Sequence, residues 1–234
     1  MQFIIEDPFW DLFPDAQIGV VVARGIDNTR AGPAGATILM ERAREAADAL
    51  ADGELASHPA VAPWREAYRA FGAKPSKYKS SIEGLLRSAR AGQTASINPL
   101  VDLYNAVSLG ALLPCGGEDL AALRGDVRLT RADGDEHFVP LGHAEPQPPW
   151  PGEMIYCDDD GAICRCWNWR EAERTKLTVA TTDALLVLEA LPPVTAAHLG
   201  AATADLARLV DEHLGGSTAV AVLNRRSPSL PLDR

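Results

Sequence analysis

Residues 96–105, SINPLVDLYN, constrain the fold most, because they define one helix with two chemically distinct sides. Asn98 followed by Pro99 predicts the helix start, since asparagine caps an orphan amide and proline fits the first helical position. At about 100° per residue, an apolar side separates from a polar one. The apolar side holds Leu100, Leu103, Tyr104 and Val107, and the polar side holds Asn98, Asp102 and Asn105. Short carboxylate and amide groups replace the usual lysines and glutamates, so we expect a defined role for this polar stripe.

Local patterns elsewhere predict interspersed strands and helices. Short β-branched runs predict strands at 3–5 and 18–23, and helical spacing predicts helices at 37–51, 60–70, 82–89 and 195–214. We expect a hairpin turning at Asp160 and Gly161, with strand alternation continuing to Trp169. Further strands are predicted at 127–130, 137–141, 184–188 and 220–223, and a turn at 115–118.

The chain of 234 residues is long enough to bury a substantial core as one domain. The proline-rich segment 145–151, EPQPPWP, is interpreted as a loop over that core, because the segment after it is too small for an independent domain. We therefore predict a mixed α+β fold, a single compact domain over 1–234 with a mixed β-sheet core covered by helices.

Charge and composition restrict the partners. A net charge of -10 argues against tight, sequence-independent binding of DNA or RNA, which relies on many contacts to phosphates. Any RNA contact must therefore be local, and residues 74–90 offer five basic side chains against one acid. No segment has the ~20 apolar residues of a membrane span, the start does not resemble a signal peptide, and four cysteines do not suggest a disulfide framework. We expect a cytoplasmic protein.

Common catalytic signatures are missing from the sequence. It contains no G-x-S-x-G elbow, phosphate-binding loop, dinucleotide fingerprint or H-E-x-x-H zinc motif, and Cys164-x-Cys166 has no second ligand pair. We expect neither a metal nor a cofactor. Two polar groups remain as candidates for a site, or alternatively for a purely structural network. One is Asn98, Asp102 and Asn105, and the other is Asn168, Arg170, Glu171, Arg174 and Thr175, with Thr178, Thr181 and Thr182 after them.

The run INPLVDLYNAVSLGALLP, residues 97–114, closely resembles the N-x-x-V-D-x-x-N-Y-V helix of the phenylalanyl-tRNA synthetase beta-subunit editing domain. The hairpin segment DDDGAIC and the later TTDALLVLE are similar to the family's D-x-x-G-x-I hairpin and Thr-rich approach to an apolar strand. Upstream, YRAFGAKPSKYKSSIEGLLR looks like the entry segment of stand-alone proteins built around that domain. Together these stretches cover residues 68–191 in the expected order.

This resemblance implies a trans-editing hydrolase that cleaves the ester bond of mischarged aminoacyl-tRNA with a bound water and no metal. The mischarged tRNA would be bound at its acceptor end. The expected catalytic residues are Glu171, Arg174 and Asn168, and Glu171 or Glu173 would hold the substrate ammonium. The expected substrate-binding residues are Asn98, Asp102, Asn105, Trp169, Arg170, Glu173 and Thr175, with Lys77 and Lys79 meeting terminal phosphates. The sequence CWNWRE replaces the family's glycine-rich segment, which suggests a narrower pocket that excludes tyrosine.

Two other functions remain open at this point. One is a non-catalytic module that keeps the fold and binds a tRNA end or an amino acid. The other is a small-molecule ester or amide hydrolase, which the acidic net charge favours because such a substrate needs no phosphate-binding surface.

Overall fold

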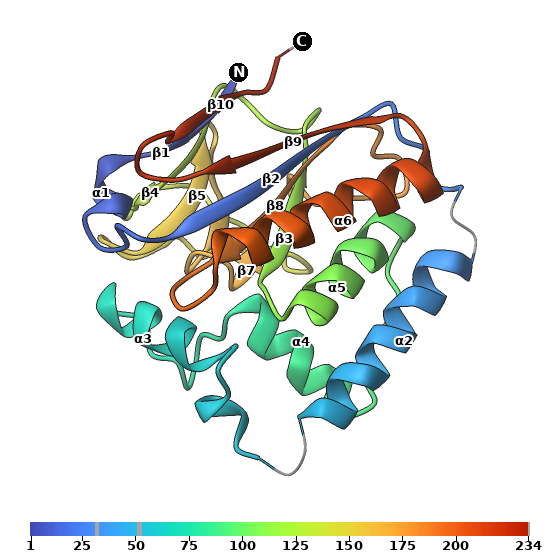
Figure 1. The fold of residues 1–234 in the computed structure, drawn as a ribbon. Helices are drawn as coiled ribbons and strands as arrows, with labels where there is room; N and C mark the ends of the chain where they lie inside the picture. Colours follow the sequence, from blue (N-terminus) through green and yellow to red (C-terminus); the bar gives the residue numbers. More distant parts are fainter. Residues whose placement is uncertain (31–32, 51–52, 234) are drawn as a thin grey trace.

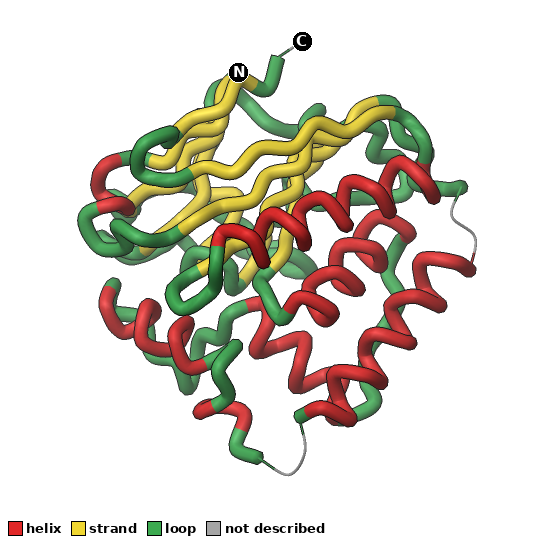
Figure 2. The backbone as a smooth tube through the Cα atoms, in the orientation of Figure 1, coloured by secondary structure: helices red, strands yellow, loops and turns green. Residues whose placement is uncertain are grey.

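A computed structural model describes residues 1–30, 33–50 and 53–233, and in this part of the chain ten strands form two β-sheets (Figures 1 and 2). The first sheet has six strands in the order β10-β1-β4-β5-β6-β7. Its strands are β10 (Ser229–Pro231), β1 (Gln2–Ile5), β4 (Val127–Arg131), β5 (Met154–Asp158), β6 (Gly161–Arg165) and β7 (Arg170–Glu171). Only β1 and β4 pair in parallel within the described sheet; the other neighbours are antiparallel.

The second sheet has four antiparallel strands in the order β3-β8-β2-β9. These strands are β3 (Cys115–Asp119), β8 (Ala184–Ala190), β2 (Gln17–Arg24) and β9 (Ser217–Leu223). The central strands β2 and β8 are almost continuous apolar runs, which is the pattern of strands buried on both faces. Val20 and Val22 pack toward the first sheet, while Val21 and Ala23 pack toward the helices.

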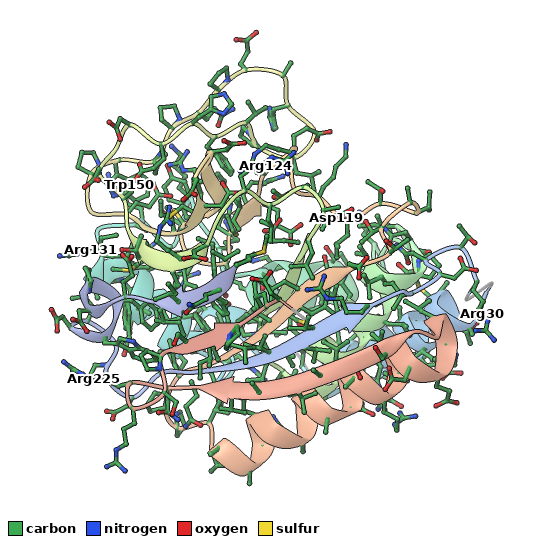
Figure 3. All side chains as sticks on the ribbon, turned by 90° about the horizontal axis from the view of Figure 1, so that it is seen from above. Arg30, Asp119, Arg124, Arg131, Trp150 and Arg225 are labelled. Atoms are coloured by element: carbon green, nitrogen blue, oxygen red, sulfur yellow. The ribbon has the colours of Figure 1, made fainter. Side chains whose placement is uncertain are left out.

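Two long helices cover the outer face of the four-stranded sheet, and a third packs outside them. The helix α6 (Ala196–Leu214) packs on β2 and β9, α5 (Pro99–Ala111) packs beside α6, and α2 (Pro33–Ala49) packs against α5 (Figure 1). The loops that carry Arg124 and Trp150 lie on the opposite side of the molecule from α6 (Figure 3). The four-stranded sheet is therefore enclosed between helices on one side and the second sheet on the other.

Shorter helices complete one end of the molecule. They are α1 (Asp7–Trp10), a 3-10 turn at Leu55–Ser57, α3 (Ala62–Ala70) and α4 (Ser81–Arg90). A carboxylate with no exposure, Glu83 of α4, pairs with Arg65 of α3 and with Arg87, each at 2.8 Å. Because removing one partner of a buried ion pair is costly, this contact fixes α4 against α3.

The helix caps predicted from the sequence are confirmed. The Asn98 side chain accepts a hydrogen bond from the amide of Val101, with Pro99 at the first helical position, and Thr195 caps α6 through the amide of His198. The strands predicted at 3–5, 18–23, 127–130, 184–188 and 220–223 all exist, and so does the hairpin at Asp160 and Gly161. The predicted end of the helix at 37–51, Ala51, lies outside the described residues.

Three local predictions were wrong. Residues 115–118 form strand β3 rather than a turn, because they pair with β8. Residues 137–141 form no strand and contribute only a bridge from Pro140 to Ala172, since β4 pairs with β1 and β5 instead. Strand β6 ends at Arg165, and the backbone then turns through Cys166 and Trp167 at positive φ. The predicted mixed α+β class and single compact domain are confirmed, with two sheets in place of one. None of the described helices is long and apolar enough to cross a lipid bilayer.

Candidate active site

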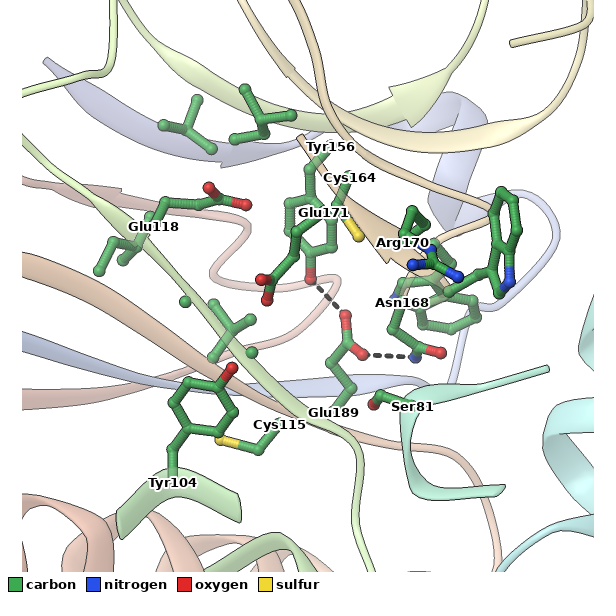
Figure 4. A pocket seen from close by; sticks show the side chains of 18 of the residues that line it. Ser81, Tyr104, Cys115, Glu118, Tyr156, Cys164, Asn168, Arg170, Glu171 and Glu189 are labelled. Atoms are coloured by element: carbon green, nitrogen blue, oxygen red, sulfur yellow. Dashed lines mark hydrogen bonds between the residues drawn. The ribbon is translucent and has the colours of Figure 1, made fainter. Parts of the chain in front are cut away.

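A cavity of about 140 Å³ lies between the facing sides of the two sheets, where their edge strands β7 and β3 come together (Figure 4). Helices α4 and α5 and the segment 167–170 close it. Its polar lining residues are Ser81, Tyr104, Asn105, Cys115, Glu118, Tyr156, Cys164, Asn168, Arg170, Glu171 and Glu189. Its apolar lining includes Val127, Ile163, Leu185, Val187, Trp167 and Trp169. The cavity thus combines a buried apolar wall with three carboxylates.

Strand alternation explains the contribution of the four-stranded sheet. Side chains alternate between the two faces, and residues paired across antiparallel strands share a face. In β8, Leu185, Val187 and Glu189 therefore face the cavity, while Leu186 and Leu188 pack against the helices. Glu118 of β3 pairs with Leu185, which places its carboxylate on the same side.

A β-bulge explains the contribution of the six-stranded sheet. Cys157 pairs with Ala162, yet Tyr156 pairs with Cys164, so Ile163 is an extra residue in β6. An extra residue reverses the facing of everything beyond it. Cys164 therefore shares the cavity side with Tyr156, and Glu171, which pairs with Cys164, follows it into the cavity. Without the bulge, Glu171 would face the outer side with Ile155.

Glu171 titrates near neutrality. Burial raises the pKa of Glu171 to about 7, and the backbone amide of Gly117 and the charge of Arg170 oppose that rise. The close approach of β3 to this carboxylate depends on glycine. A Cβ on Gly116 would lie 3.2 Å from Glu171 Oε1, and one on Gly117 would lie 2.5 Å from Leu186 Cδ2. The backbone of β3 thus forms the wall against which Glu171 rests.

Glu189 belongs to a chain of side-chain hydrogen bonds (Figure 4). It accepts one from the Tyr156 hydroxyl and one from the Asn168 amide, both at 2.5 Å, and Asn168 in turn accepts one from Tyr68 at 2.9 Å. Burial raises the pKa of Glu189 to about 7, although these donors oppose the rise. Both oxygens of this carboxylate are therefore engaged within the protein.

Glu118 is the third carboxylate. It is 8% exposed, and its Oε2 has no hydrogen-bond partner among the described residues. Burial, and then the negative charge of Glu171, raise the pKa of Glu118 well above its usual range. Figure 4 shows its carboxylate directed toward Glu171.

The segment 166–169 is held from behind by a buried ion pair. Arg165 donates to both oxygens of Glu153, at 2.9 and 2.7 Å, and Glu153 also accepts from the amide of Cys166 at 2.8 Å. Trp167 has no exposure, and its ring lies 4.8 Å from the rings of Phe9 and Trp64. These contacts stabilise the two positive φ values and leave Asn168 directed at Glu189.

The cavity opens onto a second, more exposed depression, here called the basic groove. It is lined by Lys77, Lys79, Ser80, Gly84, Leu85 and Ser88, and it shares Ser81, Asn105, Trp169 and Arg170 with the cavity. Lys77 lies 4.9 Å from the ring centre of Tyr78, and the Arg170 guanidinium lies 5.4 Å from that of Trp169. The four shared residues form the mouth between an acidic interior and a cationic exterior.

The structure brings most of the predicted site residues to this place. Asn168 and Glu171 line the cavity, Asn105, Trp169 and Arg170 lie at its mouth, and Lys77 and Lys79 line the basic groove. Asn98 and Asp102 do not line it. Asn98 caps α5 and donates to Leu177 O, while Asp102 accepts from Ser96 and from the Ile97 amide. Both side chains therefore stabilise the start of α5, and their role as substrate ligands stays a prediction.

Three other predicted site residues, Arg174, Glu173 and Thr175, also lie elsewhere. Arg174 forms a two-pronged ion pair with Asp158, at 2.7 and 3.0 Å, so it is not directed at the cavity. Glu173 pairs with Lys176 and accepts from the Gly142 amide, and that hydrogen bond is the main cause of its lowered pKa. Thr175 is fully buried beside Glu118, outside the lining. Of the two glutamates that the sequence left open, the geometry therefore favours Glu171.

Sequence reasoning missed Tyr104, Glu118, Tyr156 and Glu189 as lining residues. One signal was available for Glu189, because a lone carboxylate within the apolar run ALLVLEA must be paired or functional. Nothing comparable marked Glu118, since residues 115–118 were interpreted as a turn.

The chemistry of the lining favours acid-base and polar contacts over a covalent nucleophile. Burial raises the pKa of Cys115 and of Cys164 well above the usual range, so neither thiol is poised to ionise. Within the described part of the chain, no group of three or more histidine, cysteine, aspartate or glutamate side chains is arranged to hold a metal ion.

The chain is similar to a solved structure and to a protein family. The structure is similar to the crystal structure of an N-terminal fragment of the phenylalanyl-tRNA synthetase beta subunit from Pyrococcus horikoshii, at 11% identity and a TM-score of 0.49. That alignment covers 92% of this chain and 49% of the fragment, so the chain spans about half the fragment's length. No curated protein sequence matches the chain. The B3/4 domain, which occurs in the phenylalanyl-tRNA synthetase beta subunit, matches residues 63–213, a range that includes every residue lining the cavity. The chain therefore belongs to the B3/4 domain family.

Proposed function

We propose that the protein is an aminoacyl-tRNA deacylase that acts in trans, hydrolysing the ester bond of mischarged tRNA with a bound water. One observation carries this proposal: a cavity that holds Glu171 opens through Asn105 and Arg170 directly onto a cationic groove. An aminoacyl-tRNA end has the matching chemistry, because its aminoacyl group carries an ammonium and its ribose is followed by phosphates.

The mouth is the place where the ester would lie, since it separates the space for the aminoacyl group from the space for the nucleotide. Three donors gather there. The amide of Asn105 and the guanidinium of Arg170 line both depressions, and the buried Oγ of Ser81 has no hydrogen-bond partner among the described residues. Donors fixed before the reaction stabilise the negative charge that develops on the carbonyl oxygen.

Glu171 would hold the α-ammonium of the substrate just inside the mouth. It follows Arg170 directly in β7, so both ends of the reacting group would be positioned by one rigid strand. Water then attacks the carbonyl carbon, the bond from that carbon to the ribose oxygen breaks, and the proton released by the water ends on that oxygen. Positioning and charge stabilisation suffice for such an activated ester.

A deacylation panel with purified full-length protein tests the proposal. We expect release of the amino acid from at least one mischarged tRNA, and a loss of about ten- to hundredfold in Glu171→Ala, as for losing one charge-assisted hydrogen bond of about 1.5–3 kcal/mol. Glu66→Gln, at an exposed position of α3 outside the cavity, is the control for the loss of one acidic charge.

Each remaining outcome of the panel is informative. Unchanged turnover in Glu171→Ala would remove this residue from the mechanism. Binding of tRNA without hydrolysis across the whole panel would favour a non-catalytic module. Cleavage of free aminoacyl esters as fast as tRNA-linked ones would favour a small-molecule esterase. The acidic net charge is consistent with that function, because such a substrate needs no phosphate-binding surface.

A further inference from the structure

The cavity holds more carboxyl groups than one α-ammonium can pair with. Three carboxylates line it, and Arg170, at its exposed mouth, is the one basic side chain among its described lining residues. The carboxylate of Glu189 is satisfied by Tyr156 and Asn168, and the proposed function uses Glu171. The Thr175 hydroxyl and the charge of Arg174 favour the ionised form of Glu118, but its Oε2 has no hydrogen-bond partner among the described residues.

A buried, unpartnered carboxylate oxygen is costly unless something completes it. Glu118 is more than nine-tenths buried, lines the cavity and points toward Glu171 (Figure 4). In its ionised form it accepts hydrogen bonds and cannot donate them. The group that fits beside it is therefore a donor, and a cationic donor fits best because the neighbouring Glu171 is also acidic.

The position of Glu118 fixes where this second donor would lie. Gly116 lies against Glu171, since a Cβ added to Gly116 would lie only 3.2 Å from Glu171 Oε1. Glu118 is two residues further along β3, on the same face of the strand. Two residues of a strand span about 6.6 Å. Figure 4 places Glu171 between Arg170 and Ser81 on one side and Glu118 on the other. Glu118 therefore lies deeper in the cavity than the residue proposed to hold the α-ammonium.

The cavity wall between Glu171 and Glu118 is aliphatic. Leu185 pairs with Glu118, Val187 pairs with Gly116, and both line the cavity. An apolar wall that ends at a carboxylate suits a methylene chain that ends in an ammonium group.

We propose that the preferred aminoacyl group is that of a diamino acid such as ornithine or lysine, whose side-chain ammonium is bound by Glu118 while its methylenes lie against Leu185 and Val187. This inference rests on the proposed function and names its substrate class. Two bound ammonium groups would favour the ionised forms of Glu171 and Glu118, and would form one ion pair with each.

The test compares tRNA charged with lysine or ornithine and tRNA charged with norleucine, which is nearly the same length and lacks the side-chain charge. We expect kcat/KM to be at least tenfold higher for the cationic group, and this ratio to fall at least fivefold in Glu118→Gln. Glu66→Gln should retain the wild-type ratio. Equal rates for lysyl and norleucyl esters in the wild-type protein, or the best rate for tyrosyl-tRNA, would overturn the inference.

A binding experiment separates this failure from failure of the proposed function. Lysinamide and norleucinamide carry the same α-ammonium and need no hydrolysis, so calorimetry measures the contribution of the side-chain charge alone. Tighter binding of lysinamide that is lost in Glu118→Gln, with no ester cleaved, would contradict the deacylase and support the site. No preference for lysinamide would contradict the site even if esters are cleaved. If Glu118→Gln does not fold, Glu118→Asp, which retracts the charge by one methylene, should weaken lysinamide binding in the same assay.

Discussion

The side-chain amide of Asn168 donates to Oε2 of Glu189 across 2.5 Å and so joins the turn after β6 to the central strand β8. The same side chain accepts from Tyr68, which brings α3 into the contact. One residue therefore connects both sheets and a helix at the back of the cavity.

Replacing Asn168 by alanine should destabilise the fold as well as the site. The change leaves the Tyr68 hydroxyl and one oxygen of Glu189 without partners, at a cost of about 1–3 kcal/mol for each buried group. Urea unfolding should show the loss, and Lys74→Ala, at an exposed position, should show none. A midpoint for Asn168→Ala equal to that of the wild-type protein would mean that the link contributes nothing.

Glu189 should make stability fall as pH rises. Its folded pKa of about 7 lies above the ordinary 4.5, so between these values the folded state binds a proton that the unfolded state has lost. Its stabilising contribution is complete below about pH 4.5 and is lost by about pH 7, which amounts to up to about 3 kcal/mol. Glu189→Gln removes this dependence. The unfolding free energy of the variant minus that of the wild-type protein should therefore rise between pH 5 and pH 8, and a flat difference would show that the group titrates normally.

Gly116→Ala should impair catalysis more than stability. Its Cβ would lie 3.2 Å from Glu171 Oε1, so the carboxylate must move by a few tenths of an ångström. We expect kcat to fall about tenfold or more, as for a small misplacement of a positioning group, while the thermal midpoint changes little. Gly200→Ala on α6 is the matched control, because nothing lies within 4 Å of its added Cβ. That control should instead gain about 1 kcal/mol from helix propensity and retain full activity.

The basic groove should matter only for substrates with phosphates. The double variant Lys77→Ala and Lys79→Ala should raise KM for aminoacyl-tRNA and leave small aminoacyl esters unaffected. Binding of tRNA weakens as the salt concentration rises. Loss of two contacts to single-stranded phosphates should reduce the steepness of log association constant against log salt concentration by about 1.4. Lys74→Ala comes from the same loop but lies outside the groove, so its salt dependence should match that of the wild-type protein. An identical slope in the double variant would exclude the groove from binding.

Much of the fold could be predicted, because helix caps and hairpin turns depend on residues that are close together in the sequence. The caps at Asn98 and Thr195 and the hairpin at Asp160 and Gly161 follow from side chains within three positions of each other. Strand β3 was missed because two glycines and one carboxylate carry no strand signal, and its pairing with β8 lies about seventy residues away.

The site was predicted in part for the same reason. The segment 168–171 was identified, since polar groups after a strand are visible in sequence. Asn98, Asp102 and Arg174 were predicted as site residues and lie outside the cavity lining, because a sequence shows which groups are polar but not where their partners lie. Asp102 is buried and pairs with Ser96 only six residues away, and Arg174 pairs with Asp158. Such partners become known only when the chain is folded.

The extra residue in β6 also restricts how the hairpin can vary in length. Inserting or deleting one residue between Cys157 and Cys164 would exchange the two faces of the sheet beyond that point, and would turn Glu171 from the cavity to the opposite face, where Ile155 lies. Changes of two residues at the turn, near Asp159 and Asp160, would preserve the parity of the strand. The length of this hairpin can therefore vary only in steps of two residues if Glu171 is to stay in the cavity.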